Sequence, residues 1–316
     1  HECETSPAAG KGEEKNARHK GLINSSASGG PSATRPNGLH QYLFLICFIK
    51  IKVKKGSMTQ ARTPHKKPRL AFFSFTCCEG CQLTVLNCED EFPDIAELVN
   101  IVNFREAIDE KSDDYDIAFI EGSVSKTEEI EKLKKIRALA KVVVSYGACS
   151  ATGGINCLKN RFPIEEVKRM VYGKDAASHR LIDTIPVMPI DSVIKVDHYI
   201  YGCPILKKDF LHTLTSLLLG KNPETPNYPV CTDCKRAGNI CVFERGMTCV
   251  GPVTRAGCEA ICVTYGAVCW GCRGLVGDPN INAHAETLKR YGLDAEGITR
   301  KFDLYALCEM KKFTGK

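Results

Sequence analysis

Residues 69–81 read Arg-Leu-Ala-Phe-Phe-Ser-Phe-Thr-Cys-Cys-Glu-Gly-Cys. The run from Arg69 to Phe75 is short and almost continuously apolar, which is typical of a strand buried on both faces of a sheet. The strand leads directly into a turn that carries cysteines. The same combination, a buried strand followed by a cysteine-bearing turn, recurs twice further along the chain.

Three more apolar runs predict strands, at residues 116–120, 141–145 and 193–201. The last two lead into cysteine-bearing turns. These turns are Gly147-Ala148-Cys149, with Gly153-Gly154 close behind, and Gly202-Cys203-Pro204.

Two helices are predicted between and after these strands. Ser125 or Thr127 can cap the first helix, whose apolar residues recur at helical spacing. They are Ile130, Leu133, Ile136 and Leu139. The second helix is expected over residues 205–219, and Gly220 is its C-terminal stop. Its inward side chains are Phe210, Leu214 and Leu217. Strands that alternate with helices predict an α/β fold with a parallel, doubly wound sheet.

In such a sheet, sites form beyond the carboxyl ends of the strands. The cysteine motifs at Cys78/Cys81, Cys149 and Cys203 all follow predicted strands. Although they are far apart in sequence, this topology brings them to one edge. The pattern therefore predicts a four-cysteine centre at that edge.

A second group of cysteines lies beyond a Pro- and Asn-rich linker at residues 221–229. Its eight members are Cys231, Cys234, Cys241, Cys249, Cys258, Cys262, Cys269 and Cys272. The group opens and closes with a C-x-x-C pair, which lets two thiolates of one turn bind the same metal or cluster. Eight thiolates suffice for two further four-cysteine centres. Because this segment has few large apolar residues, we expect metal centres to supply much of its folding free energy.

Composition places these cysteines in a particular class of protein. The chain has 316 residues and 18 cysteines, too long a chain to depend on a disulfide framework. Metal or cluster ligation in a cytoplasmic protein is the better interpretation. The remaining thiols are expected to be ordinary, with Cys77 less certain; they are Cys3, Cys47, Cys88, Cys157 and Cys308.

The positive net charge of +6 belongs to the N-terminal end of the chain. Residues 1–69 hold 13 Lys or Arg and 4 Asp or Glu, so the remainder is slightly acidic. Residues 1–68 are therefore expected to be a disordered basic extension, and no nucleic-acid surface is expected on the folded part. The apolar run at residues 42–49 is far shorter than the ~20 residues needed to cross a bilayer.

Two other site chemistries are less well supported by the motifs. The chain contains no G-x-x-x-x-G-K-[ST] motif, nor a G-x-G-x-x-G after its first strand, so nucleotide binding is disfavoured. Four-cysteine sites also suit zinc. The spacing of the eight C-terminal cysteines favours iron–sulfur clusters over zinc only slightly, because both accept four thiolates.

Taken together, these motifs resemble the small, electron-transfer subunit of cytosolic multi-subunit [NiFe] hydrogenases. The resemblance covers roughly residues 69–275. It depends on Cys78-Glu-Gly-Cys81, Gly147-Ala-Cys149, Gly202-Cys203-Pro204, the segment Cys249–Cys258 and Cys269-Trp-Gly-Cys272. It implies a flavodoxin-like domain over residues 69–220 and a loop-rich iron–sulfur domain over residues 221–316.

The resemblance also implies three [4Fe–4S] clusters. Cys78, Cys81, Cys149 and Cys203 match the ligands of the proximal cluster. Cys258, Cys262, Cys269 and Cys272 match those of the medial cluster. Cys231, Cys234, Cys241 and Cys249 match those of the distal cluster. Periplasmic members have a histidine where this chain has Cys231, and they lack a cysteine at the position of Cys262.

One departure from the family pattern leaves one ligand of the proximal cluster undecided. Cys77-Cys78 is a tandem pair, and the related 20 kDa subunit of respiratory complex I uses tandem cysteines, so Cys77 is an alternative to Cys81. That subunit lacks the second cysteine-rich domain. The hydrogenase resemblance therefore leads.

The implied function is electron relay, with no bond chemistry in this chain. The implied partners are a [NiFe] large subunit and a flavin or iron–sulfur electron-acceptor subunit. The alternatives are a complex I-like, quinone-linked subunit and a zinc-stabilised interaction protein.

Overall fold

The structure is a computed structural model that describes residues 67–173 and 183–314. Its strands are β1 (Arg69–Ser74), β2 (Asn100–Phe104), β3 (Ile117–Glu121), β4 (Val142–Tyr146) and β5 (His198–Ile200). Its α-helices are α2 (Gly80–Leu86), α3 (Phe92–Leu98), α4 (Thr127–Leu139), α5 (Ala148–Thr152), α6 (Ile164–Tyr172), α7 (Lys207–Leu218), α8 (Val230–Arg236), α9 (Ile261–Thr264), α10 (Ile281–Arg290) and α11 (Ala295–Thr314). The 3₁₀ helices within the described ranges are η1 (Gly154–Arg161), η3 (Ile190–Ser192) and η4 (Val242–Arg245).

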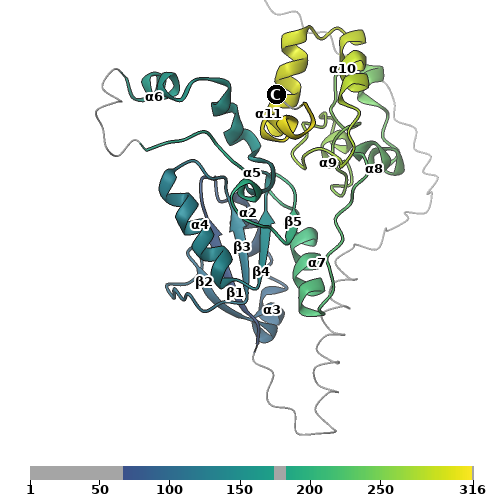
Figure 1. The fold of residues 1–316 in the computed structure, drawn as a ribbon. Coiled ribbons are helices and arrows are strands. Elements are labelled where there is room, and N and C mark those ends of the chain that lie inside the picture. Colours follow the sequence, from purple (N-terminus) through teal and green to yellow (C-terminus); the bar gives the residue numbers. More distant parts are fainter. Residues whose placement is uncertain (1–66, 174–182, 315–316) are drawn as a thin grey trace, which may run out of the picture. The chain divides into compact units, whose positions relative to one another are not determined.

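The strands form one sheet in the order β2-β1-β3-β4-β5, and every neighbouring pair is parallel (Figure 1). This is the strand order of flavodoxin-like folds, in which the chain winds first to one side of β1 and then to the other. The predicted α/β class and the parallel, doubly wound sheet are therefore confirmed.

An aromatic cluster fills one face of the sheet. The ring of Phe72 on β1 stacks on those of Phe104 and Phe119, with centroids 4.4 and 5.0 Å apart. Phe210 of α7 covers them, with its ring centroid 5.6 Å from that of Phe119. These fully buried aromatic rings fix α7 against the central strands. The turn that precedes α7, with Cys203, is fixed with it.

Helix α4 covers the opposite face through Leu133 and Ile136, which are buried as predicted. Leu139, predicted on the same face, is exposed instead, because the helix ends there and Ala140 turns into β4. The predicted caps are also wrong. The N-cap is Lys126, and the Glu129 carboxylate accepts hydrogen bonds from the backbone N–H groups of Ser125 and Lys126.

The edges of the sheet differ from expectation. The strand expected over residues 193–201 is only His198–Ile200, since upstream the N–H of Val193 donates a hydrogen bond to the carbonyl of Ile190 in a 3₁₀ turn. The opposite edge strand, β2, was not predicted. Its sequence Asn-Ile-Val-Asn-Phe is too polar to resemble the buried strands, and most of it is only partly buried.

The C-terminal cysteine-rich segment has a small apolar core of its own. Valines between the cysteines pack with Leu288 of α10 and Phe302 of α11. The expectation of little packing was thus too strict, because helices beyond the cysteine run complete the core. These helices, α10 and α11, follow directly after the cysteine run in the chain.

Helix α11 packs against η1. This contact brings Cys157 and Cys308 together as a disulfide, with Cα atoms 6.0 Å apart. Their prediction as ordinary thiols is wrong, because no local pattern indicates that helix α11 packs against η1. Cys88 is a free, buried thiol as expected.

The predicted N-terminal extension, including Cys3 and Cys47, lies outside the described residues. A domain boundary near residue 220 stays a prediction. Among the described residues, no helix combines the length and the apolar character needed to cross a membrane.

Asp116 anchors the N-terminal ends of β1 and β4. Its carboxylate accepts hydrogen bonds from the backbone and side-chain N–H groups of Arg69, at 2.9 and 3.1 Å, and pairs with Lys141. These contacts, led by the one with the Arg69 side chain, hold its pKa below the usual range. A carboxylate with a lowered folded-state pKa stabilises the fold above its unfolded pKa, and the stabilisation is lost as pH falls.

We expect Asp116→Asn to lower the free energy of unfolding at pH 7 by about 1–3 kcal/mol, because charge-assisted hydrogen bonds are lost. The difference from wild type should shrink as the pH falls well below the ordinary carboxylate pKa of about 3.9. Urea unfolding followed by circular dichroism, at neutral and at acidic pH, measures both effects. Asp113→Asn, which removes an exposed carboxylate paired with Lys135, is the matched control. A deficit of equal size at both pH values would contradict the assignment.

Candidate functional site

The carboxyl edge of the sheet gathers the first four predicted cysteines. Cys78 and Cys81 lie where β1 passes into α2, Cys149 lies in α5 directly after β4, and Cys203 follows β5. Two backbone hydrogen bonds join these turns, from Gly147 N–H to Ile200 and from Ala148 N–H to the carbonyl of Gly202. The predicted convergence of distant motifs at one edge is observed.

Glycine makes this close approach possible. A Cβ atom on Gly147 would lie 2.5 Å from the Cys81 sulfur, and its φ of +91° disfavours other residues. A Cβ atom on Gly80 would lie 3.4 Å from the Cys78 sulfur and 3.7 Å from Pro204. Sulfur atoms from two different turns are thus packed directly against backbone.

Burial dominates the acidity of these thiols. It raises the pKa of Cys149 to about 12, and the neighbouring Cys203, Cys77 and Cys78 add to the effect. The pKa of Cys81 is raised chiefly by burial, and the backbone N–H of Ile205 opposes this rise. Such buried thiols become thiolates when a coordinating metal binds.

The alternative ligand Cys77 stands beside the same group. It is half-buried, its thiol donates to the carbonyl of Phe75 at 3.5 Å, and burial raises its pKa to about 12. Because both Cys77 and Cys81 neighbour Cys149, the choice between them stays a prediction.

A buried carboxylate, that of Glu121, contacts the turn that carries Cys81. Glu121, the last residue of β3, accepts hydrogen bonds from the N–H groups of Cys81 and Gln82, both at 3.1 Å. Burial raises its pKa. No role was predicted from the sequence for Glu121, which directly follows the strand predicted over residues 116–120; an acidic residue at the carboxyl end of a buried strand is the available signal.

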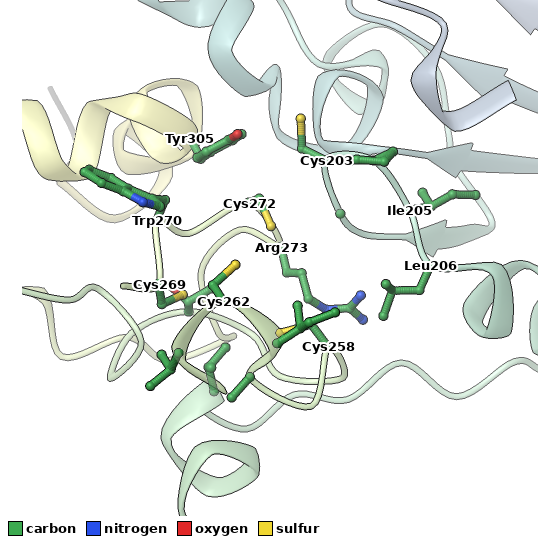
Figure 2. Close-up of a pocket in the computed structure, with 17 residues that line it drawn as sticks. Cys203, Ile205, Leu206, Cys258, Cys262, Cys269, Trp270, Cys272, Arg273 and Tyr305 are labelled. Carbon is green, nitrogen blue, oxygen red and sulfur yellow. The ribbon is translucent and has the colours of Figure 1, made fainter. Parts of the chain in front are cut away.

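Four C-terminal cysteines surround one cavity of about 270 Å³. They are Cys258, Cys262, Cys269 and Cys272. In Figure 2 the sulfur atoms of Cys262 and Cys272 lie toward the middle of this space. Cys203 from the sheet edge lines the same cavity, and its backbone N–H opposes the rise that burial causes in the pKa of Cys272. The cysteines at the sheet edge and the four cysteines around this cavity are therefore neighbours.

The other four cysteines surround a second cavity of about 280 Å³. They are Cys231, Cys234, Cys241 and Cys249. A Cβ atom on Gly251 would lie 3.3 Å from the Cys249 sulfur and 3.7 Å from that of Cys231. This glycine lets the backbone reach the second cavity as Gly147 does at the sheet edge.

Cys249 joins the two cavities, because its side chain contacts that of Cys269. The Cys269 thiol lowers the pKa of Cys249 to about 6, and the backbone N–H groups of Gly251 and Cys269, which donate hydrogen bonds to the Cys249 sulfur, act in the same direction. Lys301 of α11 lies close to both sulfurs and places its ammonium 3.8 Å from the centre of the Trp270 ring.

Arg273 fixes the wall of the first cavity. Its side chain is almost fully buried and donates hydrogen bonds to the carbonyls of Ala256 and Tyr201 and to the Asp209 carboxylate. Asp209 belongs to α7, so this ion pair ties the cysteine-rich segment to the sheet domain. The role of Arg273 was not predicted from the sequence.

Within residues 67–173 and 183–314, no three His, Cys, Asp or Glu side chains lie close enough to ligate one metal ion. The two C-terminal groups instead line cavities. A four-iron cluster is wider than a single ion and keeps its thiolates further apart.

The chain is similar in sequence to known proteins along most of its length. Residues 78–217 match the family described as NADH ubiquinone oxidoreductase, 20 Kd subunit. The chain is 33% identical over 241 residues to the sulfhydrogenase 2 subunit delta of Pyrococcus furiosus, which covers 75% of this chain and 99% of that subunit.

Two further similarities are with a subunit of the F420-non-reducing hydrogenase vhu of Methanococcus voltae and with a solved structure. The first is 32% identical, covering 66% of this chain and 82% of the relative. The second is a chain of an NAD⁺-reducing [NiFe]-hydrogenase in the H₂-reduced state, at 29% identity. It covers 51% of this chain and 96% of that chain, with a TM-score of 0.47.

We expect Arg273→Met to destabilise the protein by about 3–5 kcal/mol, because it leaves a partly buried carboxylate and two carbonyls without their donor. Arg236→Met is the control, since the Arg236 side chain is largely exposed. Thermal unfolding followed by circular dichroism measures the difference. Equal unfolding temperatures for the two variants would show that the buried ion pair does not hold the segments together.

Proposed function

We propose that this chain, which belongs to the family of small, electron-transfer subunits of [NiFe] hydrogenases and is related to the 20 kDa subunit of complex I, relays electrons through three [4Fe–4S] clusters. Hydrogenases are oxidoreductases, so the chain is a subunit of an oxidoreductase. The observation that carries the proposal is the grouping of twelve cysteines, four at the sheet edge and four around each of two cavities.

In this proposal each group holds one cluster. The proximal ligands are Cys78, Cys81, Cys149 and Cys203, the medial ligands are Cys258, Cys262, Cys269 and Cys272, and the distal ligands are Cys231, Cys234, Cys241 and Cys249. When bound, the clusters would accept and pass on single electrons. The protein's own residues supply the thiolates, the surrounding hydrogen bonds and the exclusion of water.

The residues fit such clusters in three respects. Each group consists of thiols, the ligands that iron–sulfur clusters take. Glycine keeps space beside the sulfur atoms at the proximal and distal groups. The N–H of Gly251 donates a hydrogen bond to the Cys249 sulfur, and the backbone N–H groups of Ile205 and Ala260 favour the thiolate forms of Cys81 and Cys258. Hydrogen bonds to sulfur are one of the means by which proteins set cluster potential.

The order of the three cysteine groups defines the route that electrons would take through the chain. The proximal and medial groups meet at Cys203 and Cys272, and the medial and distal groups meet at Cys269 and Cys249. Cys78 of the proximal group is exposed, and a large subunit with the nickel–iron site would dock there. Cys241 is exposed at the other end, where a flavin or iron–sulfur acceptor subunit would dock.

A complex I-like, quinone-linked role is the second candidate, because the family match over residues 78–217 is to such a subunit. The eight cysteines beyond that match favour the hydrogenase role. Co-purification with membrane subunits, and no H₂-dependent dye reduction, would favour the quinone-linked role.

We expect Cys269→Ser to interrupt electron flow and leave the large subunit bound, because Cys269 lies where the medial and distal groups meet. The measurement is H₂-dependent dye reduction by the anaerobically purified complex, together with its subunit composition. Cys88→Ser is the control, since Cys88 is a buried thiol in the apolar core. Undiminished electron transfer through the distal end in Cys269→Ser would contradict the relay.

We expect Gly147→Ala to lose about one third of the bound iron, because its Cβ atom would collide with the Cys81 sulfur. Gly292→Ala is the matched control: Gly292 has a φ of +89° but open space around it, so it shares the backbone strain without the collision. Iron and acid-labile sulfide per chain measure the outcome. Equal iron in both variants would argue against a proximal cluster at this edge.

A further inference from the structure

Helix α11 places an aromatic residue between two of the cysteine groups. Tyr305 lines the 270 Å³ cavity with Cys203 and the four cysteines of the medial group. Figure 2 shows its hydroxyl directed toward Cys203. Cys203 is the neighbouring group with the strongest electrostatic effect on this hydroxyl, followed by Cys272 and Cys149.

The backbone around Tyr305 is held from both sides. Thr152, at the end of the helix that carries Cys149, donates its hydroxyl to the carbonyl of Tyr305 at 3.2 Å. One turn later, Cys308 is joined to Cys157. On the medial side, a Cβ atom on Gly271 would lie 3.9 Å from the Cβ of Tyr305. The side chain therefore has a fixed place at the junction of the two groups.

The Tyr305 hydroxyl can donate a hydrogen bond to a cysteine sulfur. A thiolate accepts hydrogen bonds, and a donor to a ligand sulfur stabilises the reduced, more negative form of a cluster. Tyr305 is half-buried, so a hydrogen bond from its hydroxyl to a neighbouring sulfur would be partly shielded from water and correspondingly stronger.

We propose that Tyr305 is a positioning residue for Cys203: its hydroxyl donates a hydrogen bond to the Cys203 sulfur and thereby raises the reduction potential of the cluster that Cys203 helps to hold. The inference rests on the proposed function, because it requires a cluster at the sheet edge. Helix α11 would thereby help to set the reduction potential of one cluster relative to the next.

Tyr305→Phe removes only the hydroxyl and keeps the ring. In the anaerobically purified hydrogenase complex, we expect the reduction equilibrium constant of one cluster to fall about tenfold, which is about 59 mV for a one-electron couple. The distal cluster should keep its potential. Redox titration followed by electron paramagnetic resonance measures both. Tyr172→Phe, on exposed α6, is the matched control and should leave every potential unchanged.

A second readout does not depend on the stability of the variant. In reduced wild-type complex exchanged into D₂O, hyperfine spectroscopy should detect a deuteron from the Tyr305 hydroxyl coupled to the cluster. Unchanged potentials in Tyr305→Phe, with all clusters present, would overturn this inference alone. Wild-type complex without iron and sulfide in this chain would overturn the proposed function, and the inference with it.

Discussion

Three turns leave the parallel sheet at one edge, and each must bring a thiol to the same place without the backbones colliding. Gly147 meets this constraint by passing its Cα beside the Cys81 sulfur, while Ala148 bonds to the turn that carries Cys203. The aromatic core under these turns sets their spacing, since Phe72, Phe119 and Phe210 lock β1, β3 and α7 together. The positions of the first four cysteines are thus a consequence of sheet packing.

The cysteine-rich segment extends this arrangement through side-chain and backbone contacts. Arg273 ties it to α7, and Cys203 lines the same cavity as Cys272. Helix α11 then closes over both parts, with Tyr305 toward the sheet edge and Lys301 toward Cys249 and Cys269. Electron transfer between neighbouring centres needs short, fixed separations, and these contacts are what hold the three groups in sequence.

Much of this could be predicted from the sequence, for physical reasons. Buried parallel strands such as residues 117–121 have a continuous apolar pattern, and cysteines directly after them must lie at the carboxyl edge. The edge strand β2 escaped prediction because a half-exposed strand need not be apolar. The Cys157–Cys308 pair and Tyr305 escaped because their contacts depend on where α11 packs, and local periodicity does not encode the docking of a helix about 150 residues away.

The central claim is that each of the three cysteine groups holds its own iron–sulfur cluster. Anomalous diffraction at the iron absorption edge, from crystals of the anaerobically purified native complex, tests it most directly. Three separate iron centres in this chain, one bordered by each group, are the predicted result. A zinc signal at the same places, or iron that bridges cysteines of different groups, would contradict it.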